Sequence, residues 1–322
     1  MHINFNVWSI GVGGGVRTVL SLANGLTERG HKVTLTVLGK GNFDWFGEIK
    51  AEINQVETFF LQRSFRRFFM GKWDFDYAKI LTEVIPDCDV NVATYFETVY
   101  PTFFCQKGVP FFLVQHYEPW LINNEFDRNR ADFSYRLPLK KLVVSHWLQK
   151  KVGGTYIGNG VDLKKFKPVC AKSDDPSVLL FRRGIEWKER LEKRLCTNIP
   201  YRVEVVDGSY SDEELIKAYS RAWLTVFLSD YEGFGLLPLE SMACGTPVLV
   251  TDCLGINEYA QHNVNALVVP KYVYLSTFLD AIQKGLFDSK LRSQLIAEGY
   301  ATAEQYNFDV TVDKFEDIIK NG

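Results

Sequence analysis

Short apolar runs rich in valine, leucine and isoleucine recur along this chain, and segments with helical spacing separate them. The first unit of this kind is a β-type run over 3–7, a helical pattern over 16–29 and a second run over 32–38. Further runs lie at 90–93, 111–114, 142–144, 178–181, 203–206, 224–228, 248–250 and 267–269. Strands that alternate with helices form parallel sheets covered on both faces. The pattern therefore predicts an α/β protein.

A turn-rich, polar stretch divides the chain near its middle. Residues 153–176 contain three glycine-rich or aspartate-proline turns, and the 322 residues suffice for two domains of about 100 to 200 residues each. We therefore expect a Rossmann-like domain over 1–152 and a second over 153–305. The remaining residues, 306–322, are expected to form a helix that packs back toward the first domain.

Composition excludes several classes of protein. The chain has 46% hydrophobic and 24% charged residues, which excludes disordered, collagen-like and coiled-coil chains. Its 37 basic and 39 acidic residues give a net charge of −2, so we expect no nucleic-acid partner. The six cysteines are dispersed without a C-x-x-C pair, which favours reduced thiols. No signal peptide or long apolar segment is visible, so we expect a cytoplasmic protein.

A glycine-rich segment follows the first predicted strand, at the start of the first predicted helix. In Gly11 to Arg17, the residues Gly13, Gly14 and Gly15 lack side chains that would keep an anion away from the free N–H groups of the helix start. A dinucleotide site would also need an acidic residue at the end of the second strand, where this chain has Leu38-Gly39-Lys40. The alternative interpretation is a tight turn without a ligand.

The most informative segment lies at 231–248, where a strand leads into a glycine-containing loop and a short helix. Glu232 falls on the loop and Glu240 on the first turns of the helix, at the carboxyl end of the predicted sheet, where open α/β sheets bind ligands. One carboxylate can accept two hydrogen bonds from the vicinal hydroxyls of a ribose, and glycine N–H groups can face a sugar or phosphate oxygen. The alternative is one helix-capping glutamate and one solvated glutamate.

These residues carry a family resemblance. Glu232 and Glu240 have the E-x7-E spacing within E-G-F-G-L-L-P-L-E-S-M-A-C-G-T-P-V, which resembles the signature of retaining glycosyltransferases of family four, with the GT-B fold. Residues 11–17, residues 157–168 and an Arg...Lys pair within 181–188 resemble the same family. The resemblance implies two Rossmann-like domains facing across a cleft. It also implies a nucleoside-diphosphate sugar held mainly by the C-terminal domain, a hydroxyl acceptor held mainly by the N-terminal domain, and no obligatory metal or other cofactor.

The resemblance also implies roles for individual residues. An arginine and a lysine neutralise the leaving diphosphate, on which negative charge grows as the sugar departs. Lys188 matches the lysine, and either Arg182 or Arg183 matches the arginine, with the spacing favouring Arg183, although the family's flanking glycines are absent here. The implied site residues are Glu232, Arg182, Arg183, Lys188 and His116 for catalysis, Gly233, Phe234, Gly235, Leu236 and Glu240 for the donor, and Gly13, Gly14, Gly15 and Arg17 for phosphate or acceptor.

His116 and two D-x-D triplets have competing interpretations. His116 follows an apolar strand, and members of the family carry a histidine in this region, near the donor sugar, whereas a lone histidine is commonly structural. The triplets 74–76 and 87–89 match the metal and diphosphate motif of another glycosyltransferase fold, but a three-residue match often occurs by chance. We read these aspartates as helix caps or strand-flanking residues and predict no metal site.

Residues 59–73 mix four basic residues with six aromatic residues and further apolar side chains. If helical, this segment could lie at an anionic membrane surface. The favoured alternative is a core helix whose arginines face solvent or a phosphorylated acceptor. The sequence thus leaves peripheral membrane contact, at the inner face of the membrane, and a lipid-linked acceptor as open alternatives.

Together these features predict an enzyme that transfers a sugar from a nucleoside-diphosphate sugar to a hydroxyl acceptor with retention of configuration. The acceptor could be a glycan, a lipid-linked glycan or a small molecule. A sugar phosphorylase, a nucleotide-sugar epimerase of related fold and a noncatalytic sugar-binding relative are the alternatives.

Overall fold

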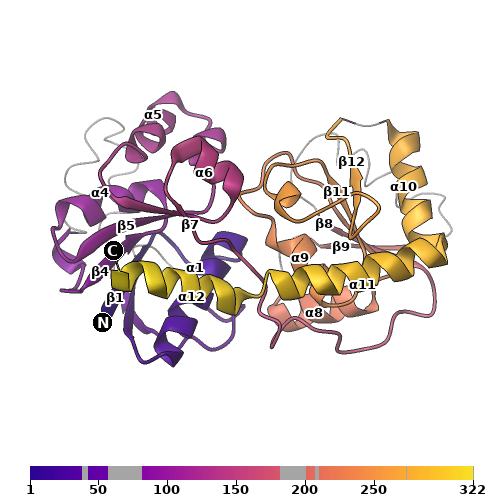
Figure 1. The fold of residues 1–322 in the computed structure, drawn as a ribbon, viewed down its shortest axis with the longest axis horizontal. Helices are drawn as coiled ribbons and strands as arrows, with labels where there is room; N and C mark the ends of the chain where they lie inside the picture. The colour runs from indigo at the N-terminus through magenta and orange to yellow at the C-terminus, as the bar shows by residue number, and fades with distance from the viewer. Residues whose placement is uncertain (38–42, 57–81, 182–200, 207–209, 273, 322) are drawn as a thin grey trace. The chain divides into compact units, whose positions relative to one another are not determined.

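In a computed structural model of the chain, the structure describes residues 1–37, 43–56, 82–181, 201–206, 210–272 and 274–321. These form two compact units, each with a parallel sheet and helices (Figure 1). Unit 1 comprises residues 1–158 and 312–322, and unit 2 comprises residues 159–311. The predicted α/β class is confirmed.

Unit 1 is built on a seven-stranded parallel sheet in the order β3-β2-β1-β4-β5-β6-β7. Its strands are β1 (His2–Val7), β2 (Lys32–Val37), β3 (Glu52–Gln55), β4 (Val90–Ala93), β5 (Val109–Val114), β6 (Lys140–Val143) and β7 (Thr155–Tyr156). Its helices are α1 (Gly14–Glu28), α4 (Phe96–Phe104), the short η1 (Glu118–Trp120), α5 (Glu125–Ser134) and α6 (His146–Val152). Each apolar run predicted in this half overlaps a strand, although the predicted runs 32–38 and 142–144 extend one residue further than β2 and β6.

The final helix, α12 (Phe308–Asn321), packs on unit 1 from Val312 onward. Phe315 stacks on Phe5 of β1 at a ring-centroid distance of 5.7 Å. Gly25 of α1 lies directly beneath Val312, because a Cβ atom at Gly25 would approach the Val312 side chain to 2.9 Å. The absence of a side chain at Gly25 therefore allows α12 (yellow in Figure 1) to lie close to α1.

Unit 2 contains a five-stranded parallel sheet in the order β12-β11-β10-β8-β9. Its strands are β8 (Ser177–Phe181), β9 (Arg202–Val206), β10 (Leu224–Phe227), β11 (Val248–Thr251) and β12 (Leu267–Val269). Its helices are α8 (Asp212–Arg221), α9 (Leu236–Ala243), η2 (Ile256–Glu258), α10 (Leu275–Phe287) and α11 (Ser289–Gln305).

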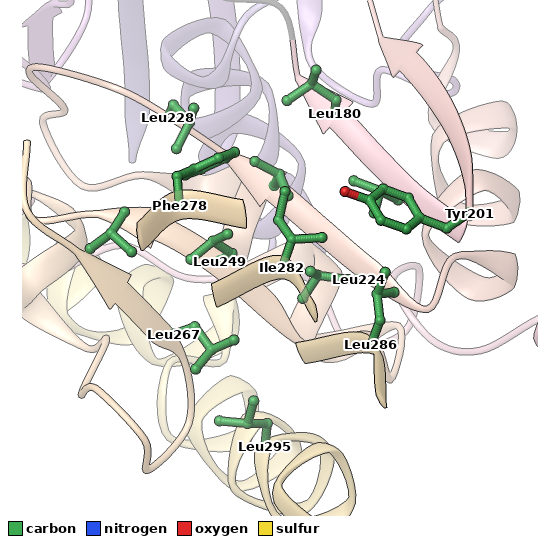
Figure 2. Close-up of a cluster of buried hydrophobic side chains, with 13 residues drawn as sticks. Leu180, Tyr201, Leu224, Leu228, Leu249, Leu267, Phe278, Ile282, Leu286 and Leu295 are labelled. Carbon is green, nitrogen blue, oxygen red and sulfur yellow. The ribbon is translucent and has the colours of Figure 1, made fainter. Parts of the chain in front are cut away.

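The core of unit 2 lies between this sheet and α10. Phe278, Ile282 and Leu286 follow one another at helical spacing along α10 and are at most 1% exposed (Figure 2). They belong to one cluster with Leu224 and Leu267 of the strands, which fixes the sheet beneath the helix and so positions the loops at its edges.

Local sequence signals account for the ends of two helices in unit 2. The side chain of Ser211 accepts from the backbone N–H of Glu214, and the Glu214 carboxylate accepts from the N–H of Ser211, which is the capping box that a Ser-x-x-Glu pattern favours. Helix α9 begins after Gly235 and ends before Gly245, and both glycines have positive φ, at 91° and 74°. In the part of the chain that the structure describes, no helix is long and apolar enough to cross a bilayer.

Candidate functional site

The segment with the E-x7-E spacing forms one loop and one helix at the carboxyl edge of the unit 2 sheet. The loop leaves β10 after Phe227 and carries Glu232, Gly233 and Phe234. Helix α9 starts at Leu236 and carries Glu240 on its second turn. The structure thus places Glu232 on the loop and Glu240 on the helix, the elements on which the sequence predicts them.

Hydrogen bonds from Ser229 fix the start of this loop. The Ser229 backbone N–H donates to Oγ1 of Thr251 at 2.9 Å, and that hydroxyl donates back to the Ser229 carbonyl at 2.6 Å. Thr251 ends the neighbouring strand β11, so the loop is held to the sheet. The Ser229 hydroxyl donates to Glu232 Oε1 at 2.9 Å, and this bond orients a half-buried carboxylate.

Close backbone contacts fix the rest of the loop. A Cβ atom at Gly255 would lie 2.5 Å from the Glu232 carbonyl oxygen, so only glycine allows the segment after β11 to approach this closely. The Tyr259 hydroxyl donates to the Gly235 carbonyl, and the ring of Phe234 packs on Tyr259 at 5.5 Å. The loop is thus held from both sides before any ligand binds.

Glu240 has a different environment. It is 1% exposed, and the Tyr219 hydroxyl donates to its Oε2 at 3.3 Å. Burial, followed by the negative charge of Glu240, raises the pKa of the Cys244 thiol to about 12, so this cysteine is protonated at neutral pH. Glu240 is more deeply buried than the sequence interpretation assumed, and Tyr219 of α8 contacts its carboxylate.

The two glutamates also act on the residues that line the loop. Burial raises the pKa of Tyr259 well above its usual value, and Glu232 and Glu240 contribute to the rise. Burial and then Glu232 raise the pKa of Cys253 to about 11. Both neighbours therefore stay neutral, and they add no further negative charge beside the glutamates.

Several predicted site residues lie outside the described residues. These are Arg182, Arg183 and Lys188, together with the basic aromatic segment 59–73 and the triplet 74–76. Of the second triplet, Asp89 accepts from the His2 backbone N–H at 2.7 Å, and Asp87 is 98% exposed beside Lys107. In the described ranges, no group of three or more His, Cys, Asp or Glu side chains is arranged to hold a metal ion.

The glycine-rich segment of unit 1 lies at the start of α1, as predicted. Gly13 precedes the helix without a side-chain cap, and a Cβ atom at Gly13 would meet open space. Gly15 faces the Gln115 side chain, since its Cβ would lie 3.5 Å from the amide oxygen. Arg17 lies over the Trp45 ring at 5.3 Å. The structure thus brings the loops after β1 and β5 together within unit 1.

His116 follows β5 and lies among aromatic rings. Its ring meets that of Trp147 edge to face at 6.3 Å, and its carbonyl accepts from the Tyr135 hydroxyl at 2.9 Å. Glu118 is 5% exposed and accepts from the Phe96 backbone N–H at 2.9 Å, which ties this turn to the start of α4. His116 therefore belongs to a rigid turn at the carboxyl edge of the unit 1 sheet.

The sequence analysis did not identify the residues that orient the glutamate loop. Ser229 directly follows an apolar strand, a position at which polar residues commonly face a ligand in α/β folds, and this signal was available. Gly255 and Tyr259 carry no such signal, because their role depends on the approach of two loops in space.

Comparison with known proteins relates the chain to glycosyltransferases. Residues 162–302 match the family described as glycosyl transferases group 1. A D-inositol 3-phosphate glycosyltransferase from Jonesia denitrificans is 36% identical over 80 residues, which are 25% of this chain and 19% of that protein. The chain therefore matches about a fifth of the length of this curated relative.

Solved structures resemble the chain over its whole length. A sucrose-phosphate synthase from Thermosynechococcus elongatus gives a TM-score of 0.78 at 18% identity, covering 100% of this chain and 98% of that one. HepE from Anabaena, solved in complex with UDP and glucose, gives 0.76 at 16% identity, with 100% of both chains covered. The fold is therefore that of the GT-B glycosyltransferases, and the match over 162–302 supports the group 1 family.

Proposed function

We propose that this chain is a retaining glycosyltransferase that moves a sugar from a nucleoside-diphosphate sugar to a hydroxyl acceptor. The observation that carries the proposal is the Ser229–Glu232 hydrogen bond at 2.9 Å, in a loop fixed at the carboxyl edge of the unit 2 sheet. A carboxylate that is oriented in advance can accept hydrogen bonds from sugar hydroxyls without first becoming ordered. The same loop lies inside the segment that matches the glycosyltransferase family.

Each residue has a role in this proposal. Glu240 binds the ribose hydroxyls, and Glu232 with the backbone from Gly233 to Leu236 binds the donor sugar. Arg182 or Arg183, with Lys188, neutralises the leaving diphosphate. In unit 1, His116 positions the reacting sugar, and the loop from Gly13 to Arg17 contacts phosphate or acceptor. The diphosphate charge is neutralised by side chains and backbone N–H groups, so catalysis needs no metal.

The configuration is retained because the acceptor attacks the donor sugar on the same face from which the leaving group departs. The acceptor hydroxyl approaches the anomeric carbon beside the departing phosphate, whose oxygen accepts the hydroxyl proton. The bond from the anomeric carbon to the phosphate oxygen breaks as the bond to the acceptor oxygen forms. No protein nucleophile is required, and each side chain acts by binding or by neutralising charge.

Related proteins guide the choice of donors to test. HepE was solved with UDP and glucose, and the Jonesia relative is called a D-inositol 3-phosphate glycosyltransferase. UDP-sugars are therefore the first donors to test, with GDP-, ADP- and dTDP-sugars beside them. A donor that binds the native protein raises its melting temperature, and a thermal-shift panel identifies it.

Turnover of that donor tests the reaction class. We expect release of the nucleoside diphosphate, with or without added acceptor, and continued release in excess EDTA. An altered nucleotide sugar without release indicates an epimerase, a requirement for inorganic phosphate indicates a phosphorylase, and binding without any turnover indicates a noncatalytic relative. If EDTA abolishes release of the nucleoside diphosphate, and manganese or magnesium restores it, the metal-independent mechanism is contradicted.

The cationic pair is tested by substitution. Lys188→Ala, and the double variant Arg182→Ala with Arg183→Ala, should lower turnover by about a hundredfold or more through lost stabilisation of the leaving group. Turnover within about threefold of the wild-type value refutes the assigned role.

A further inference from the structure

Two tryptophans of unit 1 form a stacked pair that the proposed reaction does not use. Trp120, at the end of η1, and Trp147, on α6, lie with ring centroids 5.6 Å apart and an interplanar angle of 4°. These two residues, called the tryptophan pair below, follow β5 and β6 at the carboxyl edge of the sheet. They are therefore on the same edge as His116, whose ring contacts Trp147.

One residue of the tryptophan pair, Trp120, is exposed to solvent. Trp120 is 41% exposed, whereas tryptophan is highly buried on average in folded proteins. Its stacking with Trp147 and its edge-to-face contact with Tyr117 at 5.2 Å hold the exposed ring in one orientation. A flat aromatic surface fixed in this way can receive a flat apolar face of a ligand with little loss of side-chain entropy.

Charged groups border the pair. The Lys151 ammonium lies 4.6 Å from the ring centroid of Tyr117 and 5.5 Å from that of Trp120. The Tyr117 hydroxyl donates to Asp132 Oδ1 at 2.6 Å, and Arg136 pairs with the other carboxylate oxygen at 2.7 Å. Lys151 thus lies at the ring of Trp120, and Asp132 lies at the neighbouring Tyr117, so polar groups adjoin the aromatic surface, as in sites that bind ligands with one apolar face and many hydroxyls.

Buried hydrogen bonds make the turn beneath the pair rigid. Glu118 accepts from the Phe96 backbone N–H, and the Tyr135 hydroxyl accepts from the N–H of Glu118 at 3.2 Å while donating to the His116 carbonyl. The turn that carries Trp120 is therefore fixed to the start of α4 and to the end of α5. This rigidity favours a binding surface over a ring that is exposed by chance.

We propose that the tryptophan pair is a stacking site for a pyranose ring, and that the acceptor of this protein is accordingly a saccharide. The apolar C–H face of the sugar stacks on Trp120, and Lys151 and Asp132 hydrogen bond to its hydroxyls. The inference that this saccharide is the acceptor rests on the proposed glycosyltransferase function, whereas the binding site itself does not depend on it. A lipid bilayer is the competing ligand, because tryptophan is enriched at membrane interfaces, and vesicle sedimentation distinguishes the two ligands.

Saturation-transfer NMR tests the site directly. The probes are methyl α-D-glucopyranoside, methyl α-D-mannopyranoside and methyl α-D-galactopyranoside, each added to wild-type protein, Trp120→Ala and Trp120→Phe. We expect signal on the ring C–H protons of at least one glycoside, reduced by about two- to tenfold in Trp120→Ala and less in Trp120→Phe. Phe133→Ala is the matched control, because Phe133 is 52% exposed on α5 and should leave the signal unchanged.

The outcomes separate this proposal from the proposed function. The absence of signal from all three glycosides, or equal signal in wild type and both Trp120 variants, overturns the stacking site. Trp120-dependent sedimentation with anionic vesicles in the absence of glycoside binding also overturns it, in favour of a membrane contact. Thermal shifts with nucleotide sugars are measured on the same samples. Glycoside binding without a thermal shift from any nucleotide sugar supports the stacking site and contradicts the glycosyltransferase function. A thermal shift with a nucleotide sugar but no glycoside binding supports the function and contradicts the stacking site.

Discussion

The Arg29 guanidinium forms an ion pair with the Glu316 carboxylate at 2.9 Å, although the two residues lie 287 positions apart in the sequence. The other carboxylate oxygen faces Nε2 of His31 at 3.0 Å. Arg29 follows α1 and His31 precedes β2, so this cluster fastens α12 to the first β-α-β segment of unit 1. The same contact makes the attachment of α12 dependent on pH.

Neutralising Glu316 should destabilise unit 1 in a pH-dependent way. Hydrogen bonds from Lys320, then His31 and Arg29, lower the pKa of Glu316 from 4.5 to about 2. A carboxylate with a lowered folded-state pKa stabilises the protein above its unfolded value, and this contribution is lost as the pH falls through the folded value. We expect Glu316→Gln to lower the free energy of unfolding by about 1 to 2 kcal/mol at pH 6, because solvent screens part of the pair.

Urea unfolding between pH 6 and pH 3 measures this difference, which should shrink below a pH of about 4.5. Asp317→Asn is the matched control, an exposed carboxyl on the same helix that should change stability little. A difference between Glu316→Gln and wild type that stays constant with pH contradicts the assignment.

Replacing Lys172 should stabilise unit 2. Lys172 is half-buried and its amine donates to the Thr246 hydroxyl; burial, with Arg292 as a further cause, lowers its pKa from 10.5 to about 8. The unfolded chain therefore binds one more proton than the folded chain between these two values, so wild-type stability rises with pH across that window. At pH 7 the folded protein carries a buried charge, and Lys172→Met should raise the free energy of unfolding by about 1 to 3 kcal/mol.

Chemical denaturation at pH 7 and pH 10 checks the sign. The advantage of Lys172→Met should be largest at pH 7 and smaller at pH 10. Lys290→Met, at an exposed position of the same unit, should show neither effect. A variant less stable than wild type at pH 7 would mean that the Thr246 hydrogen bond outweighs the cost of burying the charge.

Adding a methyl group at Gly255 should disturb the glutamate loop. Gly255 has φ −72° and ψ −40°, which alanine readily adopts, so its backbone would not be strained. The new Cβ would, however, meet the Glu232 carbonyl oxygen at 2.5 Å and the Phe234 nitrogen at 2.8 Å. We expect Gly255→Ala to lower turnover by about tenfold or more by displacing Glu232, with a smaller effect on thermal stability.

Steady-state kinetics and a melting curve separate these two effects. Leu254→Ala is the control, since Leu254 is the exposed neighbour at 49% and does not face the loop's backbone in the same way. Wild-type turnover in Gly255→Ala would show that the position of Glu232 does not limit the reaction.

Periodicity predicted the fold well where strands are apolar, and poorly where they are polar or short. The edge strand β3 has the sequence Glu-Ile-Asn-Gln, which carries one apolar residue, and β7 has two residues. Neither has enough pattern to be recognised. Pairing with a neighbouring strand defines both of them, and that pairing depends on the rest of the sheet.

The burial of asparagine side chains inside unit 1 could not be predicted from the sequence either. Asn4, Asn6 and Asn91 are at most 1% exposed, and the amide of Asn6 donates to Asn91 Oδ1 at 2.7 Å. A single asparagine in a strand reads as an exposed position. Its partner comes from another strand, so only the sheet order reveals why three asparagines can be buried together.

Some features of the candidate site could likewise be predicted from the sequence, and others could not. The loop and helix that carry Glu232 and Glu240 follow from local signals, namely an apolar strand, glycines and a short, largely apolar run between them. The approach of Gly255 depends on two loops meeting in space, and the hydrogen bond that Glu240 accepts comes from Tyr219 of another helix.

Binding of a nucleoside diphosphate to unit 2 is the most direct test of the central claim. Calorimetric titration of UDP, GDP, ADP and dTDP into wild type, Glu240→Gln and Glu240→Ala measures it, with circular dichroism to check that the variants fold. We predict that one nucleotide binds wild type and that Glu240→Ala weakens it by about 1.5 to 3 kcal/mol, roughly ten- to two-hundredfold in Kd. Absence of binding by all four nucleotides, or an unchanged affinity in folded Glu240→Ala, would contradict the account.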